Sequence, residues 1–143
     1  MYEDYPLAKA YSQVGWDCEG EDYEEGIYVG YRYFNSFGIE PRYEFGFGLS
    51  YTTFLSRLNG VSQSDGRVKM DVTVQNTGDT FSGKEVLQVY VRKPWGRMDH
   101  EKLSLAAFCK TEELKPGKSS QVQLEFTYRD LASYDQGLSL IHF

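Results

Sequence analysis

The feature that most constrains this chain is a series of short segments after residue 60 in which apolar and polar residues alternate. Residues 68–75 show it most clearly, because every second position is apolar: Val68, Met70, Val72 and Val74. A period of two places these side chains on one face of an extended chain. The pattern therefore predicts a half-buried β-strand, which residues 76–79 (Asn-Thr-Gly-Asp) close as a turn.

The residues after this turn repeat the same organisation. Further strands are predicted over residues 85–92, 103–110, 122–126 and 138–143, with turns at 115–118 and 135–137. Thr127 and Asp130 have the spacing of a capping box, which predicts a helical turn over 129–133. Several short strands at regular spacing predict an antiparallel β-sandwich of the immunoglobulin or fibronectin type III kind over 60–143. That length is short for seven full strands.

The first part of the chain has a different character. Residues 26–34 are predicted to form a strand that carries rings on both faces, so that both faces need to be covered. Residues 37–59 are predicted to be an extended linker rich in aromatic residues and glycine, in which Pro41 prevents a regular ladder bond. Six rings are predicted to dock on neighbouring domains: Tyr31, Tyr33, Phe45, Phe47, Tyr51 and Phe54.

Composition excludes several classes of partner. The net charge is −6 and there is no basic stripe, which argues against nucleic acid. No apolar run is long enough to span a membrane, and the start of the chain does not read as a signal peptide. Cys18 and Cys109 lack metal-site spacing and form no disulfide framework. These features favour the cytoplasm.

The sequence contains no recognisable catalytic constellation. His100 and His142 are isolated, and no nucleophile elbow, phosphate loop or zinc motif is present. We therefore predict no catalytic residue, no metal site and no cofactor in this chain. Trp95 and then Trp16 are the best candidates for stacking on carbohydrate, with contact to another domain as the alternative interpretation.

Two runs resemble a known family. Residues 24–34 (EEGIYVGYRYF) and 41–54 (PRYEFGFGLSYTTF) are similar to family 3 glycoside hydrolases, especially β-glucosidases. Residues 83–91, 114–117 and 130–135 resemble the fibronectin type III-like domain of that family. The resemblance implies that residues 1–36 end an α/β sandwich domain and that 60–143 are the fibronectin type III-like domain.

The resemblance also implies where the chemistry lies. The family's nucleophile is an Asp on a separate barrel domain, and its acid/base is a Glu; no position here matches either motif. We therefore expect an accessory portion of an enzyme that hydrolyses O-glycosidic bonds, with the barrel and α/β sandwich domains as partners. Residues 137–143 depart from the family pattern, which predicts a sandwich truncated at its C-terminal end.

Two other functions remain open from the sequence. The chain could be a stand-alone module that binds carbohydrate, including β-glucosides or oligosaccharides, or a protein-interaction module. It could equally be a purely structural sandwich that braces the catalytic domains.

Overall fold

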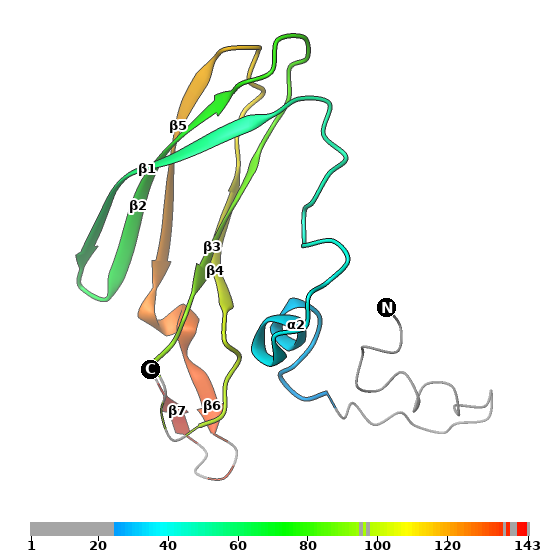
Figure 1. Cartoon of the computed structure of the whole chain (residues 1–143). Helices are drawn as coiled ribbons and strands as arrows, with labels where there is room; N and C mark the ends of the chain where they lie inside the picture. The colour runs from blue at the N-terminus through cyan, green and yellow to red at the C-terminus, as the bar shows by residue number, and fades with distance from the viewer. Residues whose placement is uncertain (1–24, 95, 97, 136, 138–139, 143) are drawn as a thin grey trace, which may run out of the picture. The chain divides into compact units, whose positions relative to one another are not determined.

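The structure is a computed structural model that describes residues 25–94, 96, 98–135, 137 and 140–142 (Figure 1). The chain divides into two compact units. The helix unit comprises Met1–Phe47 with Arg92–Leu103, and the sandwich unit comprises Gly48–Val91 with Ser104–Phe143. Within the described ranges, no helix has the length and apolar character needed to cross a membrane.

The sandwich unit is built from antiparallel strands (Figure 1). Strands β1 (Phe54–Ser64), β2 (Arg67–Asn76) and β5 (Ser119–Thr127) form one sheet in the order β1-β2-β5. Strands β3 (Val86–Val91) and β4 (Ser104–Lys110) form the second, and β6 (Ser133–Asp135) pairs with β7 (Leu140–His142). The predicted antiparallel β-sandwich is therefore confirmed.

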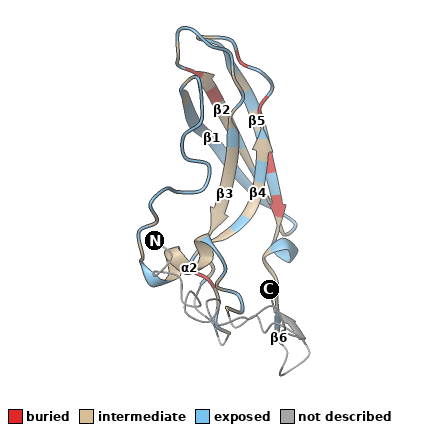
Figure 2. Ribbon diagram, turned by 90° about the vertical axis from the view of Figure 1, so that its right-hand side faces the viewer, coloured by how far each residue is buried: buried red, intermediate tan, exposed pale blue. Residues whose placement is uncertain are grey.

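The inner face of the three-stranded sheet supplies most of the core. Val68, Met70 and Val72 on β2 lie opposite Phe126, Leu124 and Val122 on β5. Among the residues that the structure describes, the buried apolar ones are few: Val74, Leu114, Leu124 and Phe126. Figure 2 shows buried residues as short red stretches in a chain that is mostly half-buried or exposed. The core of the sandwich unit therefore contains few fully buried side chains among the described residues.

The local signals downstream of residue 60 predicted the elements well. Strands β2, β3, β4 and β5 occupy the predicted segments, and β7 lies within 138–143. The capping box is also confirmed, since Thr127 and Asp130 exchange bonds at the start of the 3-10 turn η2 (Tyr128–Leu131). These elements depend on residues close in sequence, which is why a pattern predicts them.

The strand predicted over residues 26–34 is wrong. The described chain turns at residues 25–27 and then forms helix α2 (Tyr31–Phe37). Gly26 and Gly30 adopt φ of 56° and 59°, which interrupts an extended backbone. The helix brings the rings of Tyr33 and Phe37 within 4.8 Å, as expected for side chains four residues apart. Tyr31 and Tyr33 therefore do not share the face that a strand would give them.

Strand β1 begins at Phe54, inside the range predicted as linker, whereas residues 38–53 form only turns and bends. Its pattern is interrupted by a β-bulge between Leu58 and Gly60. Because Leu58 lies opposite Val72 and Val61 opposite Met70, the bulge keeps Leu58 and Val61 on the inner face. Leu58 and Val61 are three residues apart, which breaks the apolar–polar alternation seen in the other strands. For this reason the alternation did not predict β1.

Asn76 is the best-satisfied buried polar group of the sandwich unit and is fully buried. Its side-chain amide donates to the carbonyl oxygens of Phe81, at 2.9 Å, and Leu114, at 2.8 Å. Its side-chain oxygen accepts from the Thr52 hydroxyl at 2.6 Å and the Gly78 N–H at 3.0 Å. All four hydrogen-bonding positions of the amide are therefore used.

The backbone of Asn76 adds two hydrogen bonds to this cluster, which we call the Asn76 node. Its N–H donates to the carbonyl oxygen of Lys118, and its carbonyl oxygen accepts from the N–H of Gly117, both at 2.9 Å. Nearby, Gly83 and Leu114 form an isolated antiparallel bridge. The end of β2, the loop before β3 and the loop before β5 are thus held together through one residue.

Two glycines allow the close packing around this node. A Cβ on Gly78 would overlap the Thr52 hydroxyl. A Cβ on Gly83 would lie 2.9 Å from Cγ2 of Thr52 and 3.1 Å from the ring of Phe54. The chain can approach Thr52 this closely only because both positions lack a side chain.

We predict that Asn76→Ala lowers the free energy of unfolding by about 3 kcal/mol, because it leaves two carbonyl oxygens, one N–H and one hydroxyl without their buried partner. Urea denaturation followed by circular dichroism measures the change. Thr52→Val removes one bond of the node and should cost about 1 kcal/mol. That milder variant keeps the test readable if Asn76→Ala does not fold.

Asn59→Ala provides the matched control, since Asn59 is exposed and its amide makes one bond, to Thr73, at 2.8 Å. Its cost should stay below about 0.5 kcal/mol. Equal destabilisation by Asn59→Ala and Asn76→Ala would contradict a special role of the buried node.

Candidate functional site

Exposed apolar side chains gather in one stretch, which we call the ring segment: Tyr43, Phe45, Phe47, Leu49 and Tyr51. Phe45 is 75% exposed, Phe47 68% and Tyr51 87%. Large apolar side chains that cluster in solvent mark an interaction surface more often than scattered ones do. The ring segment is therefore the candidate functional site.

The backbone explains why these rings remain outside a core. Gly46 and Gly48 have φ of 84° and 77°, and Leu49 also has a positive φ of 55°. The Phe47 N–H donates to the Glu44 carbonyl oxygen at 3.1 Å, which closes a turn rather than a strand ladder. Without regular pairing, the segment has no inner face on which its rings could be buried.

Ring–ring contacts give the ring segment local order. The rings of Tyr43 and Phe47 stack with centroids 5.5 Å apart, and the Arg42 guanidinium lies 5.6 Å from the Tyr43 centroid. In the sandwich unit, the ring centroids of Tyr51 and Phe81 are 6.2 Å apart. Such aromatic contacts favour defined ring orientations over free rotation. Tyr43 and Phe81 were not singled out from the sequence; the four-residue spacing of Tyr43 and Phe47 across a turn was the available signal.

The sequence-predicted docking residues fall into two groups. Phe45, Phe47 and Tyr51 are exposed, whereas Tyr31 and Tyr33 in α2 and Phe54 in β1 are half-buried. The proposed carbohydrate-stacking residues, Trp16 and Trp95, lie outside the described residues. Exposed rings therefore lie on both sides of the boundary between the two units, with Phe45 and Phe47 in the helix unit and Tyr51 in the sandwich unit. Carbohydrate stacking by the two tryptophans stays a prediction.

The helix unit holds a buried carboxylate and a half-buried phenol. Glu101 is buried, and one of its carboxylate oxygens lies 3.9 Å from the Lys93 ammonium. Burial, a hydrogen bond to Asp99 and the negative charges of Asp99 and Glu101 raise the pKa of Tyr28 to about 12. Ser36 accepts a hydrogen bond from the Lys102 N–H at 3.0 Å. These contacts hold residues 99–102 against Tyr28 and Ser36 within the helix unit.

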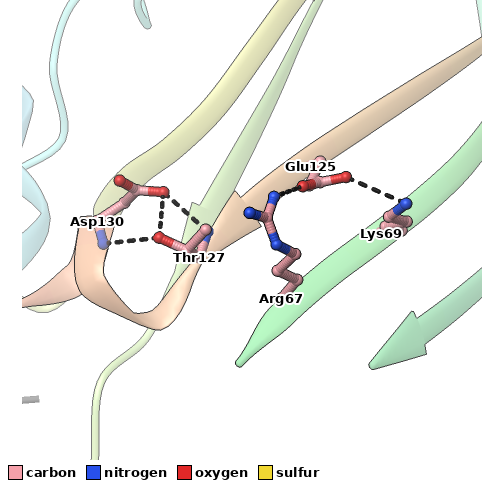
Figure 3. A network of polar contacts seen from close by, with 5 residues as sticks. All are labelled: Arg67, Lys69, Glu125, Thr127 and Asp130. Carbon is pink, nitrogen blue, oxygen red and sulfur yellow. Dashed lines mark hydrogen bonds and ion pairs between the residues drawn. The ribbon is translucent and has the colours of Figure 1, made fainter. Parts of the chain in front are cut away.

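The outer face of the three-stranded sheet carries a polar network (Figure 3). Glu125 pairs with Arg67 at 2.5 Å and with Lys69 at 3.4 Å. The hydrogen bond from Arg67 is the main cause that lowers the pKa of Glu125. Likewise, the Thr127 N–H and hydroxyl lower the pKa of Asp130. These carboxylates serve pairing and capping, and neither lies in a pocket suited to acid–base catalysis.

The remaining reactive groups have structural surroundings. The ring nitrogens of His100 lie 3.0 Å from the Glu101 carbonyl oxygen and 3.2 Å from that of Pro94. Cys109 is a free thiol in β4. Among the described residues, no group of three or more His, Cys, Asp or Glu side chains could hold a metal ion.

Comparison with known proteins places this chain in a family. Residues 85–140 match the family model of the fibronectin type III-like domain. Beta-glucosidase A of Butyrivibrio fibrisolvens is 38% identical over 93% of this chain, and a beta-glucosidase of Ruminococcus albus is 40% identical over 92%. The chain belongs to the family 3 glycoside hydrolases. It spans 18% and 13% of the lengths of those two relatives.

Solved structures of β-glucosidases match the fold as well. Beta-glucosidase 3B from Thermotoga neapolitana in complex with glucose has 52% identity and a TM-score of 0.72 over 79% of this chain. A beta-glucosidase from Paenibacillus barengoltzii has 41% identity and a TM-score of 0.80 over 96% of this chain. This chain corresponds to 16% and 15% of those proteins, so in both relatives the matched portion is part of a much larger enzyme.

We predict that Tyr28 ionises at higher pH than an ordinary tyrosine, with a pKa of about 12 instead of the usual 10.0. Because its folded pKa is raised, the stabilisation from the neutral phenol is complete below pH 10 and is lost as pH rises toward 12. Tyrosinate absorbance measures the late ionisation, which Tyr28→Phe should remove and Tyr43→Phe should leave in place. Titration curves for Tyr28→Phe and Tyr43→Phe that superimpose would contradict the assignment.

We also predict that Glu125→Gln flattens the acid limb of the stability profile. The folded pKa of Glu125 is lowered by Arg67, so its stabilising effect exists above the unfolded value of about 4.3 and is lost as pH falls through the folded pKa. Urea midpoints measured against pH should therefore converge for wild type and variant at low pH. Added salt should shrink the neutral-pH difference, because the pair is exposed.

Glu112→Gln is the control for this experiment, since Glu112 is an exposed carboxylate in the loop before β5. It should preserve the wild-type acid limb. A Glu125→Gln profile parallel to that of wild type at every pH would show that the pairing has no effect on stability.

Proposed function

We propose that this chain is the accessory, non-catalytic portion of a β-glucosidase that hydrolyses β-linked glucosides. In this proposal the fibronectin type III-like sandwich braces the enzyme, and the ring segment docks on its other domains, a barrel and an α/β sandwich. The exposed rings of the ring segment are the observation that carries the proposal. The family relationship supports the substrate class.

The energetics favour docking over exposure. Covering a ring such as Phe45, now 75% exposed, stabilises an assembly by about 2 kcal/mol. Several neighbouring rings act together on one partner surface, whereas isolated surface rings would contribute little specificity. An enzyme that contains this segment therefore gains stability when the rings are covered.

The catalytic groups are assigned to the remainder of the enzyme. In the family that this chain belongs to, an Asp on the barrel acts as nucleophile and a Glu as acid/base. No described cluster of this chain supplies two carboxyl groups facing one ligand-sized space, as glycoside hydrolysis requires. The chain contributes position and stability, and the reaction is carried out elsewhere.

We predict that the purified chain does not hydrolyse an aryl β-glucoside, whereas a chimera with this chain in place of the matched portion of Thermotoga neapolitana beta-glucosidase 3B does. In the chimera, replacing both Phe45 and Phe47 by Ser should destabilise the enzyme by about 4 kcal/mol, since two buried rings are lost. Thermal inactivation of hydrolysis measures the effect.

Phe108→Ser is the matched control, because Phe108 is 71% exposed but lies on β4 outside the ring segment. It should leave the thermal inactivation of the chimera within experimental error. Saturable hydrolysis by the isolated chain would overturn the non-catalytic assignment. Equal loss of stability in the Phe108 variant and in the Phe45 and Phe47 variant would overturn the docking assignment.

A further inference from the structure

A shallow, open hollow lies on the outer face of the three-stranded sheet in the sandwich unit. Its volume is about 540 Å³, and its lining residues come from three neighbouring strands: Asn59, Asp71, Thr73, Gln121, Val122 and Gln123. This volume falls within the range of small-molecule sites, about 300–1,000 Å³. None of these lining residues belongs to the ring segment, and the proposed docking does not use them.

Local backbone irregularity creates the hollow. The bulge in β1 leaves Asn59 without a partner residue and places Gly60 opposite Asp71. A Cβ on Gly60 would meet nothing within 4 Å, so the position beside Asp71 is open space. Bulges commonly redirect one side chain and interrupt a sheet surface. Here Gly60 places no side chain opposite Asp71, and the amide of the bulged Asn59 reaches Thr73.

The lining side chains hold one another in place and retain unused bonding positions. The Asn59 amide donates to the Thr73 hydroxyl at 2.8 Å, and the Gln123 amide donates to the Asp71 carboxylate at 3.0 Å. These bonds use one donor hydrogen of each amide and leave its oxygen available. Gln121 forms no side-chain hydrogen bond with any described residue, so both ends of its amide can bind a ligand.

The chemistry of this lining selects a class of ligand. Three amides, one hydroxyl and one carboxylate offer donors and acceptors side by side, which matches groups that both donate and accept, as hydroxyls do. An anion would meet the Asp71 charge without a lining cation. A metal ion would find a single carboxylate, and a strand-forming peptide would need a sheet edge, whereas the hollow lies on a face.

We propose that this hollow is a saccharide-binding site that uses Asp71, Gln121 and Gln123 to bind neighbouring hydroxyls of a neutral sugar. The lining contains no aromatic ring for stacking, so binding is weak and falls in the millimolar range. Such a site would hold a glycan near an enzyme without taking part in hydrolysis. The inference rests on the lining residues and does not depend on docking by the ring segment.

The test is a titration of the isotope-labelled full chain with cellobiose, followed by nuclear magnetic resonance of the backbone amides. We expect saturable shifts confined to residues 59–60, 71–73 and 121–123. Asp71→Ala and Gln121→Ala should each weaken binding about tenfold. Ser119→Ala, on the same strand β5 but outside the hollow, should change the affinity by less than about twofold.

Gly60→Thr gives an independent test by placing a side chain beside Asp71 at the border of the hollow. Its side chain would enter open space beside Asp71, and a β-branched residue suits a strand, so the variant should fold and lose cellobiose binding. Absence of saturable shifts in the wild-type chain would overturn the proposal, as would shifts centred on the ring segment. Cellobiose binding that survives both Asp71→Ala and Gly60→Thr would also overturn it. None of these outcomes bears on hydrolysis or on ring docking.

Discussion

The buried amide of Asn76 is the interaction on which the sandwich unit most depends. The residue ends β2, yet its side chain bonds to Thr52 before β1, to the loop that precedes β3 and to Leu114 before β5. A buried amide without partners would be costly, so these segments are stable only when they meet around it. The node compensates for a small apolar core, in which few side chains are fully covered.

The three-stranded sheet and the ring segment differ in the kind of surface that they expose to solvent. The outer face of the three-stranded sheet is polar and cross-linked by pairs such as Arg67 with Glu125 and Gln123 with Asp71. The ring segment instead exposes apolar surface and uses glycines in place of a regular ladder. A folded module with one solvated face and one exposed aromatic stretch is suited to a place within a larger enzyme. This division of surfaces underlies the proposed accessory function.

The success of prediction varied with the range of the interactions. The strand from Arg67 to Asn76 and the Thr127–Asp130 cap depend on neighbours in sequence, and both were predicted correctly. The stretch 26–34 was assigned to a strand because β-favouring rings dominate it, but the positive φ of Gly26 and Gly30 turns the chain toward a helix. Strand β1 was missed because its bulge hides the alternation that β2 displays.

The sequence by itself determined the class of the fold, the main strands and the family, because alternation, turn residues and the aromatic–glycine run are local patterns. It also identified the exposed rings Phe45, Phe47 and Tyr51 as docking candidates. The tertiary structure alone decided that Asn76 joins three distant segments, and that Asn59, Asp71 and Gln121 meet around one hollow. Asn59, Asp71 and Gln121 are 12 or more positions apart, and only strand register and the bulge bring them together.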